Sequence, residues 1–312
     1  MSRNILTYRI SDIVGYVDWG YFFHAWGLPF HFSSIAAVHE CEACREVWVN
    51  GFEPSERKSA REAAALFVDA RRELSRLSNY VSIRCVVRLL DASSSGDDIM
   101  LFTEESSSPT VLPMLRQQIP GKDGYCLCLS DFVAEKGCGK DTVGVFATSV
   151  ALEPLPVSAS GSVEADISTP DLKSDDYRSL LTQTLTDRLA EAAAERLHQE
   201  VRRTIWGYAP DEQMSVSDIL QGRYQGIRPA VGYPCMPDLS LNFLFDRLLD
   251  FKAVGITLTE HGMMRPHSSV SGLMLSNPYA RYFAVGHVLD DQLDDYAHRR
   301  GIDVEEMRKY LK

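Results

Sequence analysis

The sequence lacks any long run of apolar residues. None of its 312 residues belongs to an uninterrupted apolar stretch of the roughly 18–20 side chains that a membrane-spanning helix needs. The N-terminus also lacks the apolar core of a signal peptide, because Arg3, Arg9 and Asp12 interrupt it. We therefore expect a cytoplasmic protein with no membrane partner.

Positive charge is in short supply. The chain carries 32 Lys and Arg against 43 Asp and Glu, a formal net charge of −11. Binding to a nucleic-acid backbone depends on clustered Lys and Arg, which this chain does not have. We expect no nucleic-acid partner.

A disulfide framework is absent as well. The chain has seven cysteines, an odd number that fits a reduced compartment. Cys41 and Cys44 form a CxxC motif with His39 nearby, but zinc sites usually take a second pair of ligands at similar spacing, and none follows. We expect these to be ordinary helix or loop residues and predict no metal site.

The sequence has no recognisable catalytic motif. Segment 137–142 looks like part of a phosphate-binding loop, but Ala134 stands where its first Gly belongs and Asp141 where Ser or Thr should bind magnesium. His24 lies in a segment similar to the tail of a cobalt-ligating signature. Phe22 replaces the Asp that would orient that histidine. We predict no catalytic residue and no cobalamin bound through a histidine of this chain.

The composition is that of a globular protein, with 45% hydrophobic and 24% charged residues. Strands grouped before and after one long helix predict an α+β fold, with a mostly antiparallel twisted sheet flanked by helices. Ser55 is the expected N-cap of the first long helix, and 153–174, rich in Pro and Ser, is expected to be a connecting stretch. Helices are predicted at 55–77, 176–205, 215–221, 239–252, 289–299 and 303–311, and strands at 81–89, 99–102, 125–129, 143–152, 269–275 and 282–288.

The predicted helix 176–205 has two distinct sides. Apolar residues recur every fourth position from Leu181 to Val201, which predicts a buried stripe. Asp187, Glu191 and Glu195 lie on another side, where they can meet solvent or a ligand.

The most informative segment is 224–237. Three prolines, two glycines and two tyrosines within 14 residues cannot build a helix or an internal strand, so a rigid loop is expected. Its backbone groups and Arg228 could hold a small zwitterion, although an ordinary surface loop fits the composition equally well.

Segment 228–237 matches the pattern Arg-x-x-x-Gly-Tyr-Pro-x-x-Pro. It resembles the motif of the activation domain of cobalamin-dependent methionine synthases. Further blocks similar to this family follow the same order, at 16–23, 187–192, 206–210, 258–260, 269–272, 282–285 and 291–296.

This resemblance implies a single curved activation domain over residues 1–312 that binds S-adenosylmethionine in a shallow groove. In the family, the methyl group passes to reduced cobalamin held on a partner module of methionine synthase, and a flavodoxin-like or ferredoxin-like protein donates the electron. Cobalamin itself is then expected only on the partner module.

The resemblance also implies a set of cofactor-binding residues. By position, Asp18, Glu191, Arg228 and Tyr282 match ligand-contacting residues, and Ala230, Gly232, Tyr233 and Phe283 line the same region. Such a site makes physical sense because Arg228 can bind a carboxylate with two parallel hydrogen bonds, while the two acids can offset the ligand's ammonium. The chain departs from the family pattern at Cys235, Met236, Arg265, His267 and Phe283.

Three functions follow from these observations. The first is reactivation of a partner methionine synthase module. The second is a methyltransferase module acting on a different corrinoid protein or a small substrate, and the third is a binding module that has lost use of the cofactor. The sequence leaves open the corrinoid partner, the oligomeric state, and whether this is a separate subunit or a piece of a longer synthase.

Overall fold

The computed structural model describes residues 2–152 and 176–311, so the predicted connecting stretch 153–174 lies outside the described residues. The chain divides into two compact units. We call residues 1–7, 84–149 and 193–312 the sheet unit, and residues 8–83 and 150–192 the helical unit.

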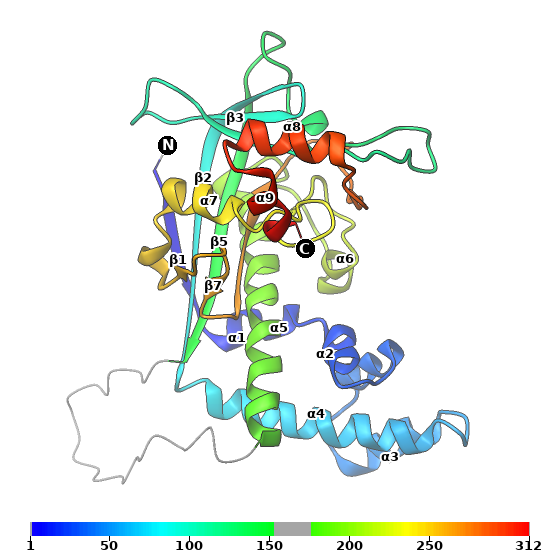
Figure 1. Cartoon of the computed structure of the whole chain (residues 1–312). Coiled ribbons are helices and arrows are strands. Elements are labelled where there is room, and N and C mark those ends of the chain that lie inside the picture. Colours follow the sequence, from blue (N-terminus) through cyan, green and yellow to red (C-terminus); the bar gives the residue numbers. More distant parts are fainter. Residues whose placement is uncertain (1, 153–175, 312) are drawn as a thin grey trace, which may run out of the picture. The chain divides into compact units, whose positions relative to one another are not determined.

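The sheet unit is built on a six-stranded sheet whose order is β4-β3-β2-β5-β8, with β1 paired to β2 outside this path. Figure 1 shows the long strands β2 and β5 side by side. β2 and β3 are antiparallel and are joined by the two-residue turn Gly96-Asp97, and β3–β4 and β5–β8 are also antiparallel. The strands are β1 (Asn4–Tyr8), β2 (Val81–Ser95), β3 (Asp98–Phe102), β4 (Thr110–Pro113), β5 (Asp141–Leu152) and β8 (Ser269–Met274), and a separate pair is formed by β6 (Thr257–Leu258) and β7 (Met264–Arg265).

Helices and apolar side chains complete the core of the sheet unit. α7 contacts β4 and β8, and α8 contacts β4 and packs against α9. Many apolar residues of β2, β3 and β5 are buried in one cluster with those of α7. This shared burial explains why these segments are rich in apolar residues. These helical elements are α6 (Val216–Leu220), α7 (Leu241–Leu249), α8 (Asp290–Arg300) and α9 (Val304–Tyr310), with short 3-10 turns η3 (Leu129–Phe132) and η5 (Phe251–Val254).

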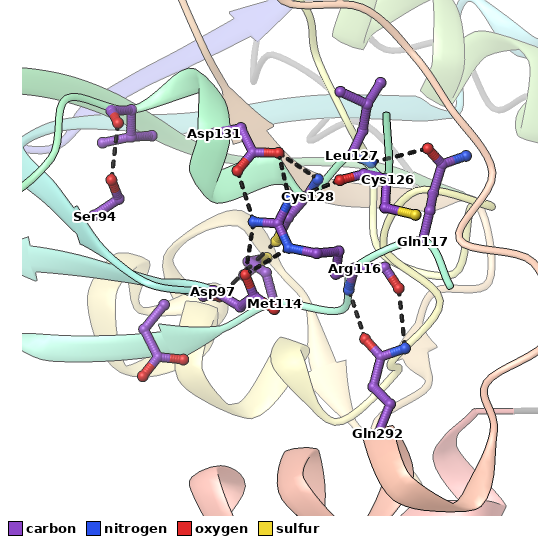
Figure 2. A network of polar contacts seen from close by, with 12 residues as sticks. Ser94, Asp97, Met114, Arg116, Gln117, Cys126, Leu127, Cys128, Asp131 and Gln292 are labelled. Carbon is purple, nitrogen blue, oxygen red and sulfur yellow. Dashed lines mark hydrogen bonds and ion pairs between the residues drawn. The ribbon is translucent and has the colours of Figure 1, made fainter. Parts of the chain in front are cut away.

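Arg116 fastens the irregular chain that follows β4 (Figure 2). Its guanidinium donates hydrogen bonds to Asp97, to both carboxylate oxygens of Asp131 and to the Cys126 carbonyl, at 2.6–2.8 Å. Gln292 of α8 accepts a hydrogen bond from the Arg116 backbone N–H at 2.7 Å and donates one to its carbonyl at 2.9 Å. The Arg116 side chain thereby holds the loop together, and its backbone binds the loop to α8 through Gln292.

The helical unit has an aromatic core. Trp19 packs edge-on against Phe22 and Phe67, and Phe32 packs in the same way against Trp48. The aromatic run near the N-terminus therefore supplies packing. Its elements are α1 (Ile10–Ile13), η1 (Val14–Tyr16), α2 (Trp19–Ala25), η2 (Phe30–Ala37), α3 (Glu42–Asn50) and α4 (Arg57–Leu77).

The chain passes from the helical unit into the sheet unit along one continuous helix, α5 (Asp176–Glu200), which ends in a π-helical turn, η4 (Val201–Ile205). The predicted stripe from Leu181 to Val201 is buried, with at most 2% of each apolar side chain exposed. Asp187, Glu191 and Glu195 are only partly buried, as the helical period requires.

The structure confirms the α+β class and most predicted elements, and it corrects three details. Residues 125–129 form no strand beyond a single bridge between Cys128 and Arg116, and 282–288 form no strand. The N-cap position of α4, the first long helix, is Glu56 and not Ser55, and the Glu56 side chain makes no capping hydrogen bond. Within the described residues no helix is long and apolar enough to cross a membrane.

The Arg116 network yields a stability prediction. Arg116→Ala leaves the carboxylates of Asp97 and Asp131 without their shared cation, so the free energy of unfolding should fall by about 1–3 kcal/mol in urea titrations. Arg308→Ala is the control, because Arg308 pairs with Asp290, which is 83% exposed. That variant should change stability by no more than about 0.5 kcal/mol. Equal decreases in the free energy of unfolding of the two variants would show that the Arg116 network contributes no more than an exposed ion pair.

Candidate functional site

The segment singled out by the sequence lies against the edge strand of the sheet. Residues 227–231 run antiparallel to β8, although they are too irregular to count as a strand. The backbone N–H groups of Ile227 and Val231 donate to the carbonyls of Leu275 and Ser271, each at 2.9 Å. Leu273 of β8 donates in return to the Pro229 carbonyl, also at 2.9 Å. The loop is therefore held to the sheet along its backbone, as expected for a preorganised segment.

Gly272 of β8 makes this close approach possible. A Cβ atom at position 272 would stand 2.1 Å from the Pro229 carbonyl oxygen and 2.9 Å from the Cα of Ala230. No side chain fits there without moving the loop. This places Ala230, a predicted site residue, in backbone contact with the sheet, where it is 5% exposed.

A tight turn follows at 232–236. Gly232 adopts φ = +86°, a conformation that side chains disfavour, and its N–H donates to the Met236 carbonyl at 2.9 Å. Tyr233 stands at the tip of this turn and is 46% exposed. The turn thus presents an aromatic ring to solvent from a fixed backbone.

A second segment, 282–285, is bound to this loop. The Tyr282 hydroxyl accepts a hydrogen bond from the Arg228 N–H at 2.9 Å, and the Val285 N–H donates to the Pro234 carbonyl at 2.9 Å. Desolvation of its hydroxyl raises the pKa of Tyr282, so this phenol stays neutral near pH 7. Phe283 turns toward the core of the sheet unit. These contacts replace the strand pairing that was predicted for this segment.

Arg228 is the charged centre of the site. It is 8% exposed, and one of its terminal nitrogens lies 2.6 Å from Oε1 of Glu195 on α5. The guanidinium carbon lies 5.7 Å from the centre of the Phe146 ring of β5. A buried guanidinium normally has an acidic partner, and the sequence did not assign this one to the site.

Glu195 is therefore a site residue that the prediction missed. Its second oxygen, Oε2, is buried and has no hydrogen-bond partner among the described residues. Glu195 lies one helical turn after Glu191 on α5. That spacing was the available signal, since both acids had already been placed on the same side of the helix.

Further polar side chains hold the C-terminal end of α5 and the π-helical turn that follows it. Arg202 is fully buried, forms two hydrogen bonds of 2.7 and 2.8 Å with Glu212, and stacks over the Tyr224 ring. Tyr224 in turn packs edge-on against His198. Burial, with further contributions from Arg202 and Arg228, lowers the pKa of His198 well below its usual value, so this histidine is neutral.

The remaining two predicted residues belong to the helical unit. Asp18 caps α2, where its Oδ1 accepts hydrogen bonds from the N–H groups of Gly20 at 2.8 Å and Tyr21 at 3.3 Å. Glu191 is on the part of α5 that falls within the same unit. The structure thus brings Arg228, Ala230, Gly232, Tyr233, Tyr282 and Phe283 together within the sheet unit, while the convergence of Asp18 and Glu191 on the same ligand stays a prediction.

Two comparisons bear on this arrangement. A family model described as "Vitamin B12 dependent methionine synthase, activation domain" matches residues 9–301. The crystal structure of the MetH reactivation domain bound to AdoHcy has a similar fold, with a TM-score of 0.80. The similarity covers 100% of this chain and 89% of that chain at 34% sequence identity.

The contact at Gly272 can be tested by substitution. Gly272→Ala should push residues 227–231 away from β8, accelerate amide exchange at Val231 and Leu273, and reduce the free energy of unfolding by about 1–3 kcal/mol. Gly15→Ala is the control, because nothing lies within 4 Å of its added Cβ. Unchanged exchange at Val231 and Leu273 in the Gly272 variant would contradict the account of a fixed loop.

The buried histidine predicts a pH dependence. The folded-state pKa of His198 lies below its unfolded value of about 6.5, so the unfolded chain takes up the proton first as the pH falls. Stability should therefore be retained above that pH and lost below it, by up to about 1.4 kcal/mol per pH unit. His198→Gln should flatten this loss in unfolding titrations between about pH 6.5 and 5, whereas replacement of the exposed His261 should not. The same slope in both variants would rule out His198 as its source.

Proposed function

Because the chain belongs to the activation-domain family of vitamin B12-dependent methionine synthases, we propose that it binds S-adenosylmethionine and supports reductive methylation of cobalamin on a partner module. The observation that carries this proposal is the fixed loop 227–236, which keeps a buried guanidinium beside surface aromatic rings. The relative that binds AdoHcy is 34% identical to this chain along its whole length, which supports a ligand of the same chemistry here.

Arg228 and Glu195 provide partners for the amino-acid end of the ligand. We assign the methionyl carboxylate to the Arg228 guanidinium and the ammonium group to the Glu195 carboxylate. A buried carboxylate oxygen without a donor is costly, and a bound ammonium supplies that donor. The residues present therefore fit a zwitterion better than they fit a neutral ligand.

The adenosyl side of the ligand is assigned to the exposed part of the loop. Tyr233 in the loop and Tyr282 in the segment 282–285 are 46% and 52% exposed and offer aromatic surface to the adenosyl group. Gly232 has no side chain, so the backbone can come close to the ligand there. Asp18 and Glu191 add negative charge that offsets the ammonium and the sulfonium. The proposal includes all eight residues identified from the sequence, together with Glu195.

The methyl transfer requires this chain only to hold and orient the methyl donor. When the methyl group leaves the sulfonium, the electron pair of the broken S–C bond stays on sulfur and S-adenosylhomocysteine is formed. Reduced cobalamin on the partner module supplies the nucleophile, so no residue of this chain has to remove a proton. A site whose tyrosines and histidine remain neutral near pH 7 suits this role.

The partners follow from the same reaction. The chain acts on the cobalamin-binding module of a methionine synthase, and a flavodoxin-like or ferredoxin-like protein supplies the electron that reduces oxidised cobalt. Residues 1–312 act as one activation domain in this proposal.

Calorimetric titration with S-adenosylmethionine tests the role of Arg228. Arg228→Ala should weaken binding by about 2 kcal/mol or more, roughly thirtyfold, because the ligand carboxylate loses a buried charged partner. Arg228→Lys keeps the charge without the two-pronged geometry and should bind with intermediate affinity.

Arg223→Ala is the matched control. Arg223 lies five residues away, is largely exposed and pairs with Asp218, so its loss should leave the affinity unchanged. Circular dichroism checks that each variant is folded. A wild type that does not bind S-adenosylmethionine, or a folded Arg228→Ala variant that binds as tightly as the wild type, would overturn the proposal.

A further inference from the structure

The helical unit contains a cluster of metal-binding side chains that the proposed function does not use. His39, Cys41 and Cys44 each offer one donor atom, and these three atoms lie within 4.8 Å of one another. His39 and Cys41 are exposed and Cys44 is partly buried, so the donors are accessible from solvent. The sequence favoured incidental cysteines here, but the geometry points to a shared site.

The start of α3 brings these donors together. Cys41 is the N-cap of the helix, and its Sγ accepts a hydrogen bond from the Cys44 N–H at 3.3 Å. The Cys41 N–H donates to Nδ1 of His39, also at 3.3 Å, which folds the preceding residues back toward the helix. Local backbone geometry alone therefore positions both sulfurs and the imidazole.

The chain in front of the helix is held from two directions. Arg45 of α3 donates a hydrogen bond to the Glu40 carbonyl, and Arg71 of α4 forms an ion pair with the Glu40 carboxylate. His39 and Glu40 also line a cavity with Arg45 and Arg71. These contacts fix the residue that lies between His39 and Cys41.

We propose that His39, Cys41 and Cys44 bind one Zn²⁺ ion, with the fourth tetrahedral position open to water. Two sulfurs and one nitrogen are the donors that a borderline-soft cation without geometric preference selects. On binding, Zn²⁺ takes two thiolates and a neutral imidazole, and the thiol protons go to solvent.

The number of donors supports metal binding over a disulfide. A disulfide between Cys41 and Cys44 would use only two of the three donor groups. The third donor therefore favours metal binding over a redox pair.

The test uses the full chain, reduced with a non-thiol reductant and stripped of metal. Calorimetry with Zn²⁺ should show one equivalent bound, and Co²⁺ substitution should give the thiolate-to-cobalt charge-transfer absorption that only sulfur ligands produce. The double variant Cys41→Ser/Cys44→Ser should weaken Zn²⁺ binding by about 100-fold or more. Loss of a group that only hydrogen-bonds to a metal ligand already weakens metal affinity about 10–100-fold, and these variants remove the ligands themselves. His39→Ala should also weaken binding while retaining the charge-transfer absorption.

Cys138→Ser is the control, because Cys138 is an exposed thiol outside the cluster. It should bind Zn²⁺ like the wild type, and circular dichroism should show that all variants are folded. The proposal fails if the reduced wild type binds Zn²⁺ no more tightly than the double variant. It also fails if the charge-transfer absorption is missing and the two thiols are consumed only on oxidation, which would identify a disulfide pair. Neither result depends on binding of S-adenosylmethionine.

Discussion

The backbone contact between residues 227–231 and β8 is the constraint on which the rest of the site depends. At Gly272 the two backbones approach so closely that no Cβ fits between them. This contact fixes the direction in which Arg228 enters the sheet unit, and the Arg228 N–H then fixes Tyr282. Gly272 therefore positions the loop 227–231, the loop positions Arg228, and Arg228 in turn positions the segment 282–285.

This arrangement explains how a site can be rigid without regular secondary structure. Prolines in 224–237 exclude a helix and remove backbone donors, so the remaining N–H groups have to find specific acceptors. They find them along β8 and Leu275, in the turn at 232–236 and in the Tyr282 hydroxyl. The Arg116 network does the same for the loop after β4. In both places, a few well-placed polar contacts do the work that a ladder of hydrogen bonds does in a sheet.

Much of the fold could be predicted from the sequence because its signals were local. The apolar stripe from Leu181 to Val201 determined the position of α5, and Gly301 ended α8 with φ = +64° as a helix cap should. Residues 282–288 were predicted wrongly because an apolar, aromatic run also suits a segment that is held by a neighbouring loop. Nothing in the run itself shows that Pro234, rather than a strand, accepts its hydrogen bond.

The site was predicted to the extent that a motif encodes it. The motif in 228–237 located Arg228, Gly232 and Tyr233, and the backbone N–H groups of Gly232 and Tyr233 donate to carbonyls within the motif. Glu195 was not assigned to the site because it pairs with a residue 33 positions away in the sequence, and only the folded structure shows that pairing.

The Arg228–Glu195 pair also has a consequence for the coupling between ligand and fold. Burying two charges is costly unless every donor and acceptor is satisfied, and Oε2 of Glu195 has no hydrogen-bond donor among the described residues. In the proposed function, a ligand ammonium would satisfy that oxygen and a ligand carboxylate would pair with the guanidinium, so binding of a zwitterion would complete a network that the described residues leave incomplete. The stability of the loop and the occupancy of the site are then linked, because a ligand that binds only the folded state stabilises it. Since Gly272 sets the position of Arg228, that linkage extends from the ligand, through one guanidinium, to the edge of the sheet.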